Sequence, residues 1–204
     1  TADTYNTAVG YRAGLSVTSG NENTIIGALA GDALTTGSSN VAVGFKALSA
    51  EDADGKNVAI GHQALELQNA GTDAFNVAVG QNAGKAITTG TTNVLVGGAA
   101  GEALTTGHTN TAIGHAALNA EDAHGRNVAI GYHALLSQNA GADAYNVAIG
   151  YQAGLNILTG VNNVLIGGQA GDAITTGTDN IAMGRQALSA KTTGGGDVAI
   201  GHQA

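Results

Sequence analysis

An acidic turn holds the residue types best suited to bind a cation. The stretch EDADG at 51–55 contains Asp52 and Asp54, which are spaced like the first ligands of an EF-hand calcium loop. A second copy of this turn reads EDAHG, with His124 in the place of Asp54, and a third reads KTTGG from Lys191. Because the carboxylates do not recur, we expect a solvated acidic turn and no cofactor, with calcium at the first copy as the alternative.

A row of rings offers a second kind of contact. Directly after a Gly that recurs along the chain stand Tyr11, Phe45, His62, His115, Tyr132, Tyr151 and His202. Such rings stack on sugars or contact a receptor, or they shield the backbone of a neighbouring sheet. We favour the structural role and leave ligand binding open. The histidines fall in different repeats, so their spacing predicts no zinc cluster.

Other chemistry finds no support in the sequence. The chain has no Gly-x-Gly-x-x-Gly, Walker, His-Glu-x-x-His or Gly-x-Ser-x-Gly pattern, and no pair of carboxylates recurs as a polysaccharide hydrolase would need. The net charge is −8, with scattered Lys and Arg, and no apolar run approaches the length of a membrane helix. We therefore expect no enzyme activity, no nucleic-acid partner and no membrane insertion.

These residues belong to a short repeat that must position them. A five-residue motif of Asn, any residue, a small or aliphatic residue, an aliphatic residue and Gly recurs along the whole chain. Three steps of seventeen residues and one of nineteen together form a 70-residue superunit. The first motif residue is Asn6, Asn23, Asn40, Asn57, Asn76, Asn93, Asn110, Asn127, Asn146, Asn163 and Asn180, with Asp197 in the twelfth copy. We interpret 1–204 as one segment of a longer chain, with superunits at about 6–75 and 76–145 and an incomplete one at 146–204.

The period identifies the fold. Steps of seventeen and nineteen residues are too short for a two-helix repeat or a propeller blade, and they suit one turn of a β-solenoid. The sequence predicts an all-β, parallel β-solenoid of twelve coils, each of seventeen or nineteen residues. In such a stack each Asn amide can bridge to the next Asn, and the motif Gly permits a sharp corner or a positive φ angle.

The two faces of the predicted strands are both apolar. We assign the fourth motif residue to the core of the coil: Val9, Ile26, Val43, Ile60, Val79, Val96, Ile113, Ile130, Ile149, Ile166, Met183 and Ile200. We assign the third residue to a subunit interface: Ala8, Ile25, Ala42, Ala59, Ala78, Leu95, Ala112, Ala129, Ala148, Leu165, Ala182 and Ala199. A strand that is apolar on both faces is typically covered on both, and another copy of the chain would supply the cover. The alternative is a monomeric roll in which the small column faces the opposite wall and the Val/Ile column is half-buried.

The motifs also carry a resemblance. NVAIG followed by Ala three residues later resembles the head repeat of YadA-like trimeric autotransporter adhesins, and NTAVGYRAG…TSGNENT is similar to repeats in phage tail-fibre proteins, especially of marine phages. The resemblance covers all twelve copies, although the coils are longer than is usual in adhesin heads. It implies a left-handed β-roll, a homotrimer with these strands toward the axis, and a place in a virion tail fibre or on a cell surface.

Two functions follow as expectations. The first is a structural or adhesive fibre segment that mediates attachment to a host or surface, with itself as partner and a receptor that the sequence does not identify. The alternative is an ice-binding β-solenoid or another extracellular filament. Ice binding would use regular threonine pairs, which stand at Thr35 and Thr36, Thr88 and Thr89, Thr105 and Thr106, and Thr175 and Thr176. Two of every four coils interrupt that array.

Overall fold

The structure is a computed structural model that describes residues 4–53 and 55–204. This part of the chain forms twelve three-residue strands and no helix, so the predicted all-β parallel β-solenoid is confirmed, with about eleven turns. The strands are β1 (Thr7–Val9), β2 (Thr24–Ile26), β3 (Val41–Val43), β4 (Val58–Ile60), β5 (Val77–Val79), β6 (Val94–Val96), β7 (Thr111–Ile113), β8 (Val128–Ile130), β9 (Val147–Ile149), β10 (Val164–Ile166), β11 (Ile181–Met183) and β12 (Val198–Ile200).

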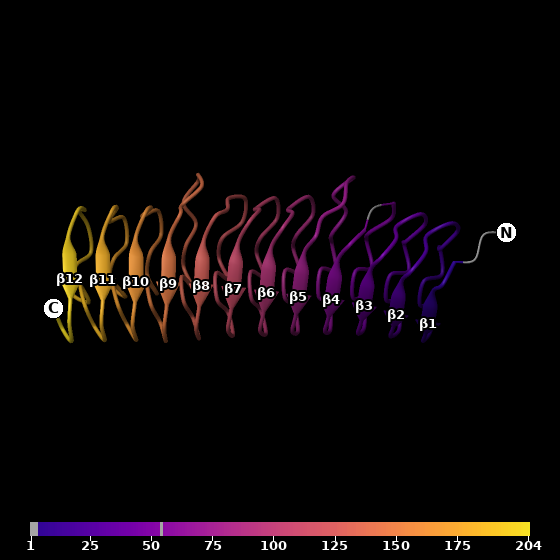
Figure 1. Cartoon of the computed structure of the whole chain (residues 1–204), viewed down its shortest axis with the longest axis horizontal. Helices are drawn as coiled ribbons and strands as arrows, with labels where there is room; N and C mark the ends of the chain where they lie inside the picture. The colour runs from indigo at the N-terminus through magenta and orange to yellow at the C-terminus, as the bar shows by residue number, and fades with distance from the viewer. Residues whose placement is uncertain (1–3, 54) are drawn as a thin grey trace.

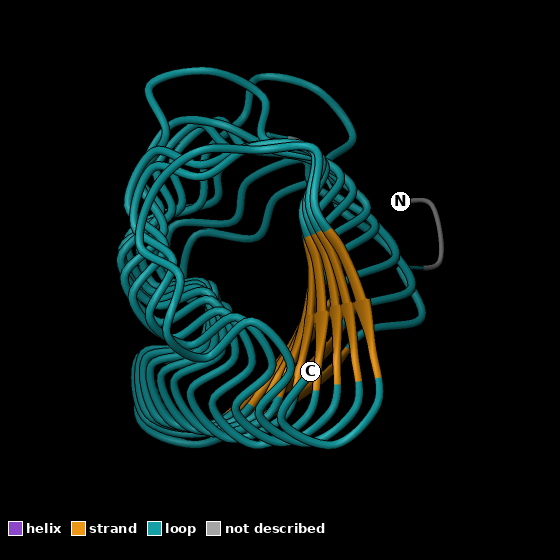
Figure 2. Ribbon diagram, turned by 90° about the vertical axis from the view of Figure 1, so that its left-hand side faces the viewer, coloured by secondary structure: helices purple, strands orange, loops and turns teal. Residues whose placement is uncertain are grey.

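The strands stack in chain order into one parallel sheet. Figure 1 shows them side by side from β1 at one end of the rod to β12 at the other. The register keeps like positions together, as in the pairing of Ala42 with Ala59. The two longer coils, from β4 to β5 and from β8 to β9, keep this register because their extra residues leave the coil in turns near Gly71 and Gly141. Figure 2 shows these two turns standing out from the other coils.

The motif glycines form the corners at which the strands end. All twelve have φ between +129° and +142°, a region that residues with a side chain avoid. Their backbones are also in close contact from coil to coil, since a Cβ on Gly44 would lie 2.4 Å from the carbonyl oxygen of Gly61. Gly therefore recurs because both the conformation and the spacing between coils require it.

The motif asparagines form a buried ladder along the rod. The backbone N–H of Asn40 donates to Oδ1 of Asn23 at 2.9 Å, and Nδ2 of Asn23 donates to the carbonyl oxygen of Gly37 at 2.9 Å. The N–H to Oδ1 bond recurs from each coil to the next, and in the last coil Asp197 donates its N–H to Asn180. Each amide thus satisfies polar groups at the corner that closes its coil.

The third motif residue packs inside the coil, which corrects its assignment to a subunit interface. These side chains are fully buried within a single chain, except for Ala199 at 8% exposure and Ala8 in the first coil, which is exposed. The column comprises Ala8, Ile25, Ala42, Ala59, Ala78, Leu95, Ala112, Ala129, Ala148, Leu165, Ala182 and Ala199. The interior of so narrow a coil admits mostly Ala, and the monomeric alternative described this face correctly.

The side of the coil that faces the strands, which we call the opposite wall, adjusts to the size of the third motif residue. Where the strand supplies Leu95, the wall supplies Gly101, and a Cβ there would lie 2.9 Å from Cδ2 of Leu95. Where the strand supplies Ala112, the wall supplies the fully buried Leu118. A large residue on one wall thus faces a small one on the other in these coils, whereas in the first coil of each superunit both are small, as with Ala78 and Gly84.

Candidate functional site

The outward face of the sheet is a continuous apolar strip, which we define as the second and fourth motif residues of all twelve coils. The fourth residues, assigned to the core from sequence, point outward instead, and Ile26, Ile60 and Ile113 are 38–39% exposed. The reason is the alternation of side chains along a strand: once the third residue faces inward, its two neighbours must face outward.

The composition of this strip is unusual for an exposed surface. The fourth position is Val, Ile or Met in all twelve coils, and the second is Val or Ile in nine and Thr in three. Eleven steps of about 4.8 Å give the strip a length of roughly 50 Å. A parallel strand with apolar side chains on both faces is typical of a sheet covered on both faces. The strip is therefore the surface of this chain best suited to bind another apolar surface.

The rings predicted from sequence lie beside this strip, at the position after the corner glycine, and form two stacked groups. The ring centroids of Phe45 and His62 lie 5.3 Å apart. Those of His115 and Tyr132, and of Tyr132 and Tyr151, each lie 5.6 Å apart. These contacts join neighbouring coils, as a structural role requires.

The remaining two rings of the row stand apart from both groups. Tyr11 is exposed in the first coil, and the ring of His202 contacts the guanidinium of Arg185. Between the groups, Gln81 and Gly98 interrupt the row and leave a hollow of about 210 Å³ against His115. The structure therefore brings together five of the seven predicted rings.

We expect the pKa of His133 to lie below the ordinary value of 6.5. Burial lowers it, because His133 stacks on Tyr132 with centroids 3.8 Å apart, and the neighbouring His115 lowers it further. Folding therefore becomes less favourable as the pH falls below 6.5, since the folded chain binds this proton less readily than the unfolded chain. Replacing His115→Ala should raise the pKa of His133 in an NMR titration, and an unchanged value would contradict the assigned cause.

The acidic turn differs in each of its three copies. In the first, Asp54 lies outside the described residues, and Nδ2 of Asn57 donates to Oε2 of Glu51 at 3.3 Å. In the third, Lys191 replaces the glutamate and forms an ion pair with Asp197. The calcium pair of Asp52 and Asp54 is thus not tested by the structure.

The second copy of the turn places Glu121, Asp122 and His124 together. One possible ligand atom from each lies within 4.8 Å of the other two, the one such group among residues 4–53 and 55–204. Glu121 is fully buried, and burial raises the pKa of its carboxyl group, an effect partly opposed by the N–H and the imidazole of His124. From sequence, His124 counted only as the replacement of Asp54 that weakens the calcium alternative, and neither His124 nor Glu121 was predicted as a ligand.

No family model, curated protein or solved structure matches the chain. No helix able to span a bilayer is found among the described residues.

The threonine pairs of the ice-binding alternative are partly engaged in the coil. Oγ1 of Thr35, Thr105 and Thr175 donates to a backbone carbonyl oxygen of the next coil at 2.9 Å in each case. Thr36 and Thr106 do the same at 3.2 Å. Hydroxyl groups held in this way stabilise the stacking of coils and have one fewer donor to offer to ordered water.

Proposed function

We propose that this chain is a structural and adhesive fibre segment, the shaft or receptor-binding region of a phage tail fibre or of a trimeric surface adhesin that attaches to a host or surface. The observation that carries the proposal is the apolar strip, which runs the whole length of the rod on the outer face of the sheet. A rod that exposes such a strip is stabilised when an equally long apolar surface covers it.

A second copy of the chain is the partner that fits best. The strip repeats at every coil, so parallel copies match it along its full length, coil against coil. The chain carries a net charge of −8, while the strip has no charged residue. Association through the strip therefore brings apolar side chains together and leaves the acidic groups apart in water.

The number of copies and the hand of the coil come from the resemblance to adhesin heads and tail fibres. By that resemblance the fibre is a homotrimer of left-handed coils, and it stands on a virion or a cell surface. The correction of the strand faces fits this arrangement, because the Val/Ile columns now point away from the coil and toward the proposed axis.

Light scattering after size exclusion, at two protein concentrations, tests this assembly. We expect a mass near three times the 19.9 kDa of one chain. The variants Ile60→Asp and Ile113→Asp place a charge in the centre of the strip and should shift the mass toward that of one chain. Leu67→Asp is the matched control, because Leu67 is 47% exposed outside the strip. A monomeric wild-type chain, or an equal loss of mass in the control, would overturn the proposal.

A further inference from the structure

One column of side chains inside the solenoid is apolar in some coils of each superunit and polar in others. At the twelfth position of the coil, counted from the motif Asn, the residues are Val17, Leu34, Glu51, Gln68, Ile87, Leu104, Glu121, Gln138, Ile157, Ile174 and Lys191. The first and second coils of each superunit have an apolar side chain at this position. In superunits 6–75 and 76–145, the third coil has Glu and the fourth has Gln. Glu121 and Gln138 are fully buried. A buried carboxylate is costly unless a cation or several donors compensate its charge.

The buried carboxylate of Glu66 provides a comparison, because it has basic partners. Glu66 is 8% exposed, and its carboxylate lies 3.1 Å from Nζ of Lys46 and 3.8 Å from Nζ of Lys85. Within the described residues the one basic group in ion-pair range of Glu121 is the imidazole of His124, with Nδ1 at 3.8 Å from Oε1. The negative charge of Glu121 is thus less well compensated than that of Glu66.

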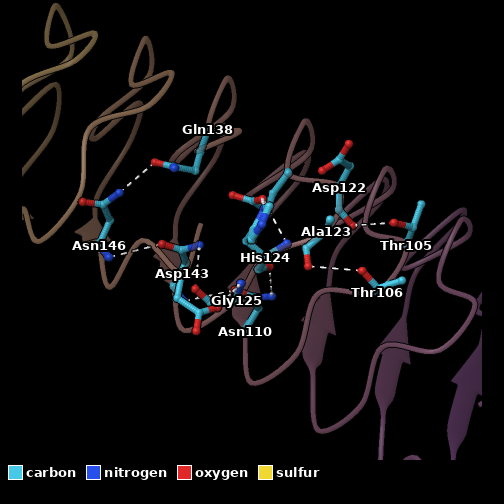
Figure 3. Close-up of polar contacts among 12 residues, drawn as sticks. Thr105, Thr106, Asn110, Asp122, Ala123, His124, Gly125, Gln138, Asp143 and Asn146 are labelled. Carbon is cyan, nitrogen blue, oxygen red and sulfur yellow. Dashed lines mark hydrogen bonds and ion pairs between the residues drawn. The ribbon is translucent and has the colours of Figure 1, made fainter. Parts of the chain in front are cut away.

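Two buried atoms of this turn form no hydrogen bond. Oε1 of Glu121 accepts the backbone N–H of His124 at 3.3 Å, and the backbone N–H of Ala140 lies near enough to lower the pKa of this carboxyl group. Oε2 of Glu121 and Nδ1 of His124 are buried and form no hydrogen bond. Figure 3 shows Asp122 and His124 on the turn between the coil of Thr105 and that of Gln138. A lone pair on each orphaned atom, with the carboxylate of Asp122 nearby, forms a set of ligands suited to a cation.

We infer that the turn at 121–124 binds one divalent cation of the Zn²⁺ class through Glu121, Asp122 and His124. A tetrahedral Zn²⁺ with bonds of about 2.0–2.1 Å holds its ligand atoms about 3.4 Å apart. The separations here, 3.8 Å between Nδ1 and Oε1 and at most 4.8 Å within the set, require a small inward movement of the side chains. Water completes the coordination on the exposed side of Asp122.

The ligand types select the class of cation. An imidazole nitrogen suits Zn²⁺, Cu²⁺ or Ni²⁺, whereas Ca²⁺ and Mg²⁺ prefer oxygen ligands alone. The replacement of aspartate by His124 between the first and second copies of the turn thus favours a softer cation than the calcium considered from sequence. Neither the apolar strip nor the number of copies in the fibre enters this inference.

Isothermal titration of the whole 204-residue chain with Zn²⁺ tests the site. We expect one Zn²⁺ per chain at the site, at least tenfold weaker binding in His124→Asn, and no displacement by equimolar Ca²⁺. His108→Asn is the control for a histidine outside the cluster. The double variant His115→Asn/His133→Asn controls for the ring row, where these two centroids lie 5.8 Å apart.

The outcomes of this titration distinguish the site from other histidines. Wild-type binding retained in both controls and weakened in His124→Asn, with unchanged circular dichroism, supports the site. Glu121→Gln should weaken binding as well, while it preserves the size of the buried side chain. No Zn²⁺ binding by the wild type, equal binding by His124→Asn, or loss of binding only in the double variant would overturn the inference.

Discussion

Replacing Gly114→Ala is expected to destabilise the centre of the solenoid by about 3 kcal/mol or more, since a disallowed backbone angle and a backbone overlap add together. Gly114 has φ +134°, and a Cβ there would lie 2.4 Å from the carbonyl oxygen and 2.6 Å from the carbonyl carbon of Gly131. These are backbone atoms of the next coil, so relief requires two coils to separate. Urea unfolding followed by circular dichroism measures the loss.

Gly141→Ala is the matched control for this prediction. Gly141 also has a positive φ, +71°, but a Cβ there meets no atom within 4 Å, because the residue lies on a protruding turn. Only the left-handed backbone angle then opposes the methyl group, at a cost of about 1–2 kcal/mol. Equal unfolding midpoints for the two variants would show that contact between coils does not determine the role of the corner glycine.

Asn146→Leu is expected to have the second large effect, also about 3 kcal/mol or more, because it leaves several buried polar groups without partners. Oδ1 of Asn146 accepts the N–H of Asn163 at 2.9 Å, and its Nδ2 donates to the carbonyl oxygen of Gly160 and to Oε1 of Gln138, both at 2.7 Å. Leucine has a similar size and replaces none of these bonds. Thermal unfolding at fixed protein concentration measures the difference.

Asn156→Ala provides the comparison for the ladder. Asn156 is exposed, and its Nδ2 donates to the carbonyl oxygen of Asp172 at 2.8 Å. Because water can replace a bond at the surface, we expect a change of about 0.5 kcal/mol. If the two variants unfolded at the same temperature, the buried ladder would contribute no more than a surface amide.

The repeat predicted the solenoid and its register, but not which strand face lies inside. Both faces are apolar, so the usual contrast between a polar and an apolar face was missing. The deciding signal was an exchange of side-chain size across the coil: the small Gly101 lies opposite the large Leu95, and the large Leu118 lies opposite the small Ala112. That exchange involves two walls of one coil and cannot be recognised from a single strand.

The acidic turn was located from sequence, but its buried member was not. The spacing of Asp52 and Asp54 drew attention to carboxylates in a loop, where charged residues ordinarily face water. Glu121 occupies the place that Leu104 holds in the preceding coil, so its side chain enters the core. The signal for its burial was available in the sequence. When the coils are aligned by position, Glu and Gln interrupt an apolar column.

The placement of β1 and β12 at opposite ends of the rod has a mechanical consequence (Figure 1). The hydrogen bonds between coils run along the rod, so a force that pulls its ends apart acts directly along these bonds. When one end coil peels away, it releases about 55–60 Å of chain and shortens the rod by only about 5 Å. A stretched segment of this kind would lengthen in steps of one coil and absorb work at each step while the remaining coils stay intact.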